Sequence, residues 1–169
     1  MFTVREETPG DIAAIGEVHR VAFGGEDEAT LVDLLRSTSC VLVSQVALVG
    51  DRIVGHILFS PLIIETSEGE RIAAALAPMA VLPEWQRRGA GSALVRAGLE
   101  ACRNQGIDAV IVVGHPEYYP RFGFSSTLAL DLQSSYSDLG DAWMALELRP
   151  GALAGVSGRV RYPAAFAGI

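Results

Sequence analysis

The stretch LAPMAVLPEWQRRGAGSALVRAGLE, residues 76 to 100, decides the fold of this chain. It begins as an apolar run typical of a strand, breaks at Pro83, passes through a basic turn and enters an amphipathic helix at Gly89-Ala90-Gly91. A helix therefore begins soon after a strand ends. Its first backbone amides have no partners within the helix and lie at the positive end of the helix dipole, so they form an anion site.

The residues of this turn predict that the anion is a pyrophosphate. Gly89 and Gly91 lack the side chains that would keep a phosphate away from the amides, and Arg87 and Arg88 add positive charge beside them. A P-loop would require a lysine after the second glycine, where this chain has Ser92. A dinucleotide fingerprint would place the glycines immediately after the strand, but the residues Pro-Glu-Trp-Gln-Arg-Arg intervene.

Two motifs in this region resemble those of one enzyme family. The sequence QRRGAG (86–91), after Val81-Leu82-Pro83, resembles the Gln/Arg-x-x-Gly-x-Gly/Ala acyl-CoA loop of the GNAT superfamily of N-acetyltransferases. A second segment, YPRFGF (119–124), is similar to the Tyr-x-x-x-Gly-Phe segment of that family. The resemblance extends over residues 2–148 and is greatest for bacterial members with His-Pro-x-Tyr-Tyr-Pro-Arg-Phe-Gly-Phe. Two motifs in the expected order are more specific than either one.

The resemblance implies how acetyl-CoA is bound. The strand before the loop is expected to splay away from its neighbour, so that its free backbone groups contact pantetheine while the loop amides hold the diphosphate. The cofactor-binding residues expected from the motif are Met79, Ala80, Val81, Gln86, Arg87, Arg88, Gly89, Ala90, Gly91 and Ser92. No metal is expected.

Acetyl transfer to an amine needs a neutral nucleophile, a donor to the developing oxyanion and a proton for the departing thiolate. The family's tyrosine in the second motif is commonly assigned the acid role, which falls here on Tyr119, or on Tyr118 if the register differs by one. A phenol with a pKa of about 10 keeps its proton at neutral pH and passes it to a thiolate whose conjugate acid has a pKa of about 8.5. A backbone amide near Ala80 or Val81 is the expected oxyanion donor.

The base is open between His115, Glu117, His56 and Glu84, with a water chain as the alternative to all of them. His115 is preferred, because an imidazole has an ordinary pKa of about 6.5 and this residue follows a strand at the end where open α/β sheets bind ligands. Its position before Pro116 also fits a structural role, in which the ring braces a turn. A single histidine in a β-rich run, such as His56, is more often structural.

Hydrophobic periodicity predicts one α/β (α+β) domain over residues 1–150. The resemblance implies that its fold is GNAT-like, with a mixed central sheet that has antiparallel N-terminal strands, a splayed parallel pair in the centre and helices on both faces. A strand at 2–5 and helices at 8–22 and 26–36 precede three β-rich runs at 41–49, 53–65 and 71–81. These runs form an antiparallel meander, with Pro61 interrupting or bending the second run. A helix that ends at Gly106 and a buried strand at 109–113 complete a parallel crossover.

The remaining segments carry weaker signals. A short helix is expected to start at Pro116, and residues 128–132 and 143–148 predict two more strands. Residues 151–169 form a C-terminal extension, packed on the same domain or on a partner subunit, and within it residues 156–162 fit an extra strand or an arm. The resemblance also implies that residues 23–28, between the first two helices, face the acceptor; the alternative is an ordinary helix break.

Composition limits the class of function. Of the 169 residues 50% are hydrophobic and 20% charged, which indicates a folded globule, and the net charge of −7 argues against a nucleic-acid groove. No apolar run reaches the roughly 18 residues of a membrane span, and the N-terminus lacks a signal-peptide layout, so a cytoplasmic protein without a membrane partner is expected. Cys40 and Cys102 predict neither a disulfide framework nor a metal site.

The function that the resemblance implies is transfer of an acetyl group from acetyl-CoA to a primary amine, on a small molecule or a protein, by direct attack on the thioester. The alternative is a non-catalytic acyl-CoA-binding sensor or regulatory module. The expected partners are an amine substrate and, because exposed strand edges favour pairing, a second copy in a homodimer.

Overall fold

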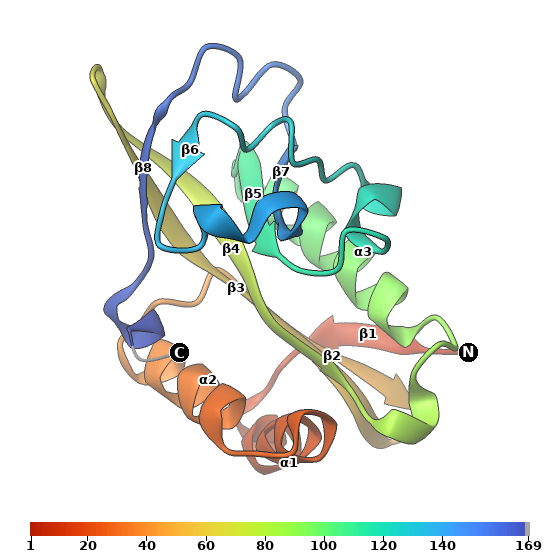
Figure 1. Ribbon diagram of the computed structural model, residues 1–169. Helices are drawn as coiled ribbons and strands as arrows, with labels where there is room; N and C mark the ends of the chain where they lie inside the picture. The colour runs from red at the N-terminus through yellow and green to blue at the C-terminus, as the bar shows by residue number, and fades with distance from the viewer. Residues whose placement is uncertain (168–169) are drawn as a thin grey trace.

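The computed structural model describes residues 1–167 and has a mixed sheet at its centre (Figure 1). The main path of the sheet runs β1-β2-β3-β4-β5-β7, while β8 pairs with β3 and β6. The strands are β1 (Thr3–Glu6), β2 (Val43–Val49), β3 (Arg52–Thr66), β4 (Gly69–Val81), β5 (Ala109–Val113), β6 (Leu132–Gln133), β7 (Trp143–Glu147) and β8 (Gly158–Arg161). The helices are α1 (Ile12–Phe23), α2 (Asp27–Ser37) and α3 (Ala90–Asn104).

The first four strands pair antiparallel, β1 with β2, β2 with β3 and β3 with β4. The chain then crosses through α3 to β5, which pairs parallel with β4, and β7 closes the path antiparallel to β5. The predicted antiparallel meander and the parallel crossover are both confirmed.

The parallel pair in the centre is splayed. Strands β4 and β5 pair only at Ala74 with Val110 and at Ala75 with Ile111. Beyond this point β4 continues to Val81 without β5 beside it, because β5 has turned away and ends at Val113. Figure 1 shows the two strands diverging. Backbone groups on this edge of β4 are therefore left without a strand partner, as predicted.

Helices cover both faces of the sheet because successive residues of a strand point to opposite sides. Val46 of β2 belongs to a fully buried cluster with Ile15 of α1 and Leu35 of α2. Its neighbour Ala47 is equally buried, but in the cluster that contains Leu94 of α3. In Figure 1, α1 and α2 accordingly lie together, well separated from α3. The predicted fold class is confirmed.

Pro61 does not interrupt the second β-rich run, and that part of the prediction was wrong. Strand β3 is continuous from Arg52 to Thr66, and Pro61 pairs with Ala74 of β4. On the other edge of β3, β2 pairs up to Phe59 and β8 begins to pair at Ile63. Pro61 thus lies between two partner strands, where its missing N–H leaves no ladder position unpaired.

The segment predicted as a strand at 128–132 is mostly a series of turns, which corrects that prediction. The amides of Ala129, Leu130 and Leu132 donate to carbonyls three residues earlier, and only Leu132–Gln133 forms a strand. This spacing buries Ala129 and Leu132 and leaves Leu130 exposed. The short helix near the second motif also differs, because it is a single 3-10 turn (Tyr119–Phe122) that starts after Pro116.

The segment after Pro150 packs against its own chain. Strand β8 pairs antiparallel with β3 and parallel with β6, and Leu153, Val156 and Val160 are buried in a cluster with residues of β3, β4 and β5. The last part of the predicted extension, residues 168–169, lies outside the described residues. No helix within residues 1–167 has the length and apolar character needed to cross a membrane.

Candidate active site

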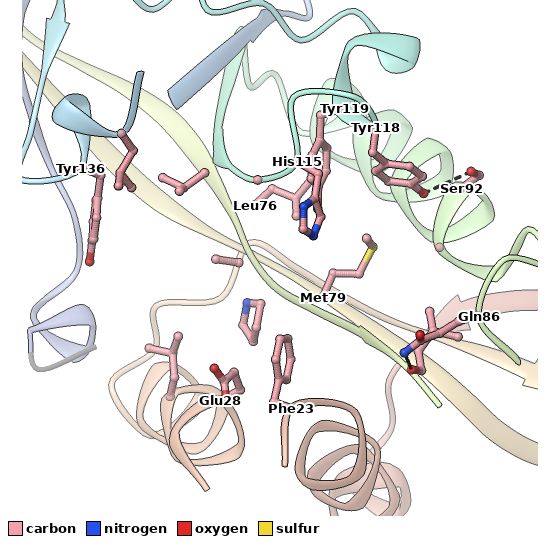
Figure 2. A pocket seen from close by; sticks show the side chains of 18 of the residues that line it. Phe23, Glu28, Leu76, Met79, Gln86, Ser92, His115, Tyr118, Tyr119 and Tyr136 are labelled. Atoms are coloured by element: carbon pink, nitrogen blue, oxygen red, sulfur yellow. Dashed lines mark hydrogen bonds between the residues drawn. The ribbon is translucent and has the colours of Figure 1, made fainter. Parts of the chain in front are cut away.

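A pocket of about 1010 Å³ opens where β4 separates from β5. One wall comes from the splayed part of β4 and the start of α3, and the other from the segment after β5 that carries His115, Tyr118 and Tyr119. Helices α1 and α2 contribute Phe23 and Glu28 from below (Figure 2). Both predicted motifs therefore meet at a single pocket.

The loop between β4 and α3 offers a row of unpaired amides. Arg87 and Gly89 both have left-handed backbone conformations, with φ of 61° and 98°, which turn the chain sharply into α3. The first amide to bond within the helix is that of Ala93, which donates to the carbonyl of Gly89 at 3.0 Å. Within residues 1–167, the amides of residues 87–92 have no hydrogen-bond acceptor. Such amides bind an anion.

The side chain of Gln86 holds this loop against the strand. Its Nε2 donates to the carbonyl of Val81 at 2.9 Å (Figure 2). The bond spans the 3-10 turn at Pro83–Trp85 and fixes where the loop amides lie relative to the end of β4. Gln86 therefore positions the loop that carries the unpaired amides.

Seven of the ten predicted cofactor-binding residues line the pocket, namely Met79, Val81, Gln86, Arg87, Gly89, Gly91 and Ser92. The other three do not. The methyl groups of Ala80 and Ala90 are buried in the core, and the guanidinium of Arg88 lies over the ring of Trp85, 5.4 Å from its centroid. Of the two predicted arginines, Arg87 is thus the one that lines the pocket.

Tyr118 crosses the pocket to the start of α3. Its hydroxyl lies 3.1 Å from Oγ of Ser92, which is hydrogen-bonding distance (Figure 2). A Cβ at Gly91 would approach the same hydroxyl to 3.1 Å. Gly91 is therefore needed for the close approach of Tyr118 as well as for access to the amides.

Tyr119 is buried, with 7% of its surface exposed, yet it lines the pocket. Its ring packs edge-on against Tyr118 and Phe124, at centroid distances of 5.2 and 5.7 Å. Burial, with Tyr118 adding to it, raises the pKa of Tyr119 to about 12. The phenol is therefore protonated at neutral pH, and no group in residues 1–167 forms a hydrogen bond with its hydroxyl. An uncommitted, protonated donor of this kind can serve as an acid.

Of the predicted base candidates, only His115 lines this pocket. Its side chain is 81% exposed, with Nδ1 3.7 Å from Oε1 of Glu117. His56 is fully buried elsewhere, between His19 and Ser44, and Glu84 lies outside the pocket beside Arg52. Within residues 1–167, no group of three or more His, Cys, Asp or Glu side chains is arranged to hold a metal ion.

The end of the pocket away from the loop contains residues that the sequence reasoning did not place there. Tyr136, Leu139, Tyr162 and Phe166 come from the last third of the chain. They lie beyond both motifs. Tyr136 and Leu139 come from the segment between β6 and β7, whereas the pairing of β8 with β3 brings Tyr162 and Phe166 to the site. The predicted acceptor-facing segment 23–28 does contribute, through Phe23 and Glu28 at its two ends.

Comparison with known proteins agrees with this geometry. Residues 3–127 match the family described as Acetyltransferase (GNAT) domain. The chain is 40% identical over 125 residues to YjhQ of Escherichia coli K12, an uncharacterized N-acetyltransferase. This match covers 73% of this chain and 69% of the relative. It is also 31% identical over 160 residues to the N-acetyltransferase YhbS of the same strain, covering 94% of this chain and 95% of the relative.

Two similar structures contain a coenzyme. The crystal structure of YhbS from Escherichia coli in complex with CoA has a TM-score of 0.89 and 30% identity, and the match covers 98% of this chain and 91% of the other. A GNAT family acetyltransferase from Brucella melitensis in complex with acetyl-CoA has a TM-score of 0.80 and 32% identity, with 98% of both chains covered. From the family match, the relatives and the shared fold, we conclude that this chain belongs to the GNAT family of acetyltransferases.

Proposed function

We propose that this protein transfers the acetyl group of acetyl-CoA to a primary amine by direct attack of the amine on the thioester. The observation that carries the proposal is the row of unpaired amides at residues 87–92, which faces a pocket opened by the splay of β4. The CoA and acetyl-CoA complexes of the two similar structures support it. Bound to these amides, the diphosphate would direct the pantetheine arm along Met79 and Val81.

Tyr119 is the proposed acid and His115 the proposed base. The amine nitrogen forms a bond to the acetyl carbon, the carbon–sulfur bond breaks, and the sulfur leaves as a thiolate. Tyr119 donates its proton to this thiolate, which suits a hydroxyl that is protonated and has no other partner. Overall the ammonium loses two protons, one to CoA thiol through Tyr119 and one to solvent through the exposed ring of His115.

The role of His115 is tested by the pH dependence of kcat/KM. His115→Gln is expected to lower kcat/KM by about 10²- to 10⁴-fold and to remove one limb of the pH profile, because general bases contribute at about this level. An unchanged profile would assign proton removal to water.

The proposed function is tested by release of free thiol from acetyl-CoA with a panel of amines, together with mass spectrometry of the product. The sequence contains no lysine, so side-chain amines of the protein cannot act as acceptors and mimic turnover. We expect thiol release that depends on an amine. Tight binding of acetyl-CoA without thiol release for any amine would instead indicate an acyl-CoA sensor.

A further inference from the structure

The end of the pocket opposite the loop, here called the acceptor end, combines one carboxylate with aromatic and aliphatic side chains. It is formed by Phe23, Glu28, Tyr136, Leu139, Tyr162 and Phe166. Figure 2 shows Glu28 and Phe23 reaching up from α2 and α1, with Tyr136 across the pocket on the side away from Gln86. These residues come from three separate parts of the chain and converge on the same space.

Glu28 gives this end a negative charge. It is the only carboxylate among the described residues that line the pocket, and it is partly buried there. The arginines of α1 and α2 are paired with other acids, Arg20 with Glu26 and Arg36 with Glu7. The carboxylate of Glu28 therefore stays available for a cation, and a partly buried charge of this kind favours an ammonium over a neutral or anionic group.

The rest of the acceptor end is apolar and aromatic. Tyr162 packs edge-on with Tyr136 and tilted against Phe166, at centroid distances of 5.0 and 5.1 Å, which makes a rigid wall. Phe23 and Leu139 are 48% and 52% exposed although they line a pocket. Covering such surface with an apolar ligand is favourable, and aromatic rings add a preference for a further ring in edge-to-face contact.

We infer that the acceptor is a small primary amine, bound as its ammonium ion by Glu28, whose remaining part is an aromatic ring held by the apolar side chains of the acceptor end. This inference rests on the proposed function, since it names the substrate class of that reaction. An amine that carries a carboxylate does not match this end of the pocket, because Glu28 would repel that carboxylate. A purely polar amine does not match it either, because it would cover no apolar surface.

The contribution of Glu28 is tested with 2-phenylethylamine as the probe. Glu28→Gln is expected to raise KM for this amine by about 10- to 100-fold, the value of a charge-assisted hydrogen bond, while the affinity for acetyl-CoA is kept. Asp27→Asn is the matched control, because both acids are in the first turn of α2 but only Glu28 lines the pocket. Equal KM values for the two variants would overturn the role of Glu28.

The aromatic preference is tested by comparing 2-phenylethylamine with ethylamine, ethanolamine and glutamate. We expect kcat/KM to be about 10- to 100-fold higher for the aromatic amine. Leu139→Asn should reduce this ratio by about 3- to 30-fold. Leu130→Asn should leave it unchanged, since Leu130 is also exposed but lies outside the pocket. Equal or better turnover of ethanolamine or glutamate would overturn the inference and leave acetyl transfer itself intact.

A binding measurement separates this inference from the proposed function. Calorimetry of 2-phenylethylamine with the protein–CoA complex is expected to show binding that Glu28→Gln weakens and Asp27→Asn does not. Such binding without turnover of any amine would contradict the proposed function and support the acceptor end as a binding site. Absence of binding together with turnover of polar amines would contradict the inference alone.

Discussion

Tyr118 and Tyr119 are neighbours in the chain, but their hydroxyls serve different parts of the pocket. The hydroxyl of Tyr118 is hydrogen-bonded to Ser92 at the start of α3, whereas the hydroxyl of Tyr119 has no hydrogen-bond partner in the described part of the chain. Burial raises the pKa of the Tyr119 hydroxyl to about 12, so this group keeps its proton at neutral pH in the pocket that the splayed part of β4 also lines. The two residues can therefore be distinguished by mutation.

Tyr119→Phe is expected to lower kcat by about 10- to 10⁴-fold, because it removes the proton donor and leaves the ring packing in place. Affinity for acetyl-CoA should stay nearly unchanged in calorimetry. Tyr118→Phe should alter kcat by only a few-fold, since it removes a hydrogen bond to Ser92. A larger loss of kcat in Tyr118→Phe than in Tyr119→Phe would assign the acid role to Tyr118.

Motif reasoning located the residues of the loop better than the directions of their side chains. The glycines and Ser92 belong to the pocket wall, because a motif specifies the local backbone. Arg88 was expected beside the diphosphate, but its guanidinium lies over Trp85. A stacking contact of that kind depends on the neighbouring fold, and the order of residues in the motif does not reveal it.

Helix α3 must lie very close to the sheet, and Gly98 is what allows it. A Cβ at Gly98 would overlap the ring of Phe59, which is completely buried and cannot move aside. Gly98→Ala is therefore expected to destabilise the protein by about 1–3 kcal/mol, despite the better helix propensity of alanine. Gly16→Ala in α1 is the control and should stabilise by up to about 1 kcal/mol, because only the flexible end of Arg20 lies nearby. Urea unfolding that shows the same sign for both would contradict this packing.

The turn that begins α3 carries the proposed anion site, and Gly89→Val tests it. The substitution places a branched side chain beside the unpaired amides and strains a residue with φ of 98°, so CoA affinity should fall by about 10-fold or more. Gly106→Val is the control, because Gly106 follows the other end of α3, also has a positive φ and has open space around it. Thermal melts should show similar losses of stability. Unchanged CoA affinity of Gly89→Val in calorimetry would refute the anion site.

The positions of helices and strands were predictable where a periodic pattern was bounded by turn residues, as in β2 to β4 and α3. They were not predictable where the structure of a segment depended on which strand lies beside it. Pro61 stays within β3 because it lies where that edge of β3 has no partner, between the end of the pairing with β2 and the start of the pairing with β8. Residues 128–132 are mostly apolar, as in a strand, yet they form turns that bury Ala129 and Leu132 and leave Leu130 exposed.

A chain of buried polar groups ties the N-terminal helices to the sheet. Glu7 accepts hydrogen bonds from Arg36 and from Ser44, Ser44 lies 2.8 Å from Nε2 of His56, and Nδ1 of His56 lies 2.8 Å from Nε2 of His19. If each group donates toward Glu7, both rings are neutral with the proton on Nε2. Nδ1 of His19 is then the unpaired end of the chain, as observed.

This network makes the stability of the fold sensitive to acid. Burial, assisted by nearby His56 and Arg36, lowers the pKa of His19 to about 3, from an ordinary value of 6.5. Burial by itself raises the pKa of Glu7, but the nearby ring of His56, with Nε2 3.6 Å from Oε1, and the hydrogen bonds from Arg36 and Ser44 outweigh it and lower the pKa to about 2, from 4.5. In both cases the unfolded chain binds more protons than the folded protein, so stability falls as the pH falls.

We expect the free energy of unfolding to decrease below about pH 6.5 through His19 and further below about pH 4.5 through Glu7. Each proton taken up on unfolding contributes about 1.4 kcal/mol per pH unit. In urea titrations between pH 7 and 5, His19→Gln should reduce the slope of the free energy of unfolding against pH. His115→Gln, which changes an exposed ring, should leave that slope as it is in the wild type. A slope that is equal in all three proteins would contradict the buried network.

The overall fold and the pocket wall formed by β4, the loop and the start of α3 could be predicted from the sequence, because hydrophobic periodicity and two local motifs indicated them. The acceptor end and the His19–His56 contact could not. Both join segments that are far apart in sequence and carry no motif, such as Phe23 with Tyr162, or His19 with His56. Their positions follow from how the C-terminal segment and the first helices pack on the sheet.

The unpaired amides of residues 87–92 are the feature on which the proposed chemistry depends. A crystal structure of this protein with bound CoA tests it directly. We predict that the diphosphate accepts hydrogen bonds from these amides, that the pantetheine arm runs along the splayed part of β4, and that the sulfur faces the hydroxyl of Tyr119. CoA bound elsewhere on the protein, with these amides not involved, would contradict it.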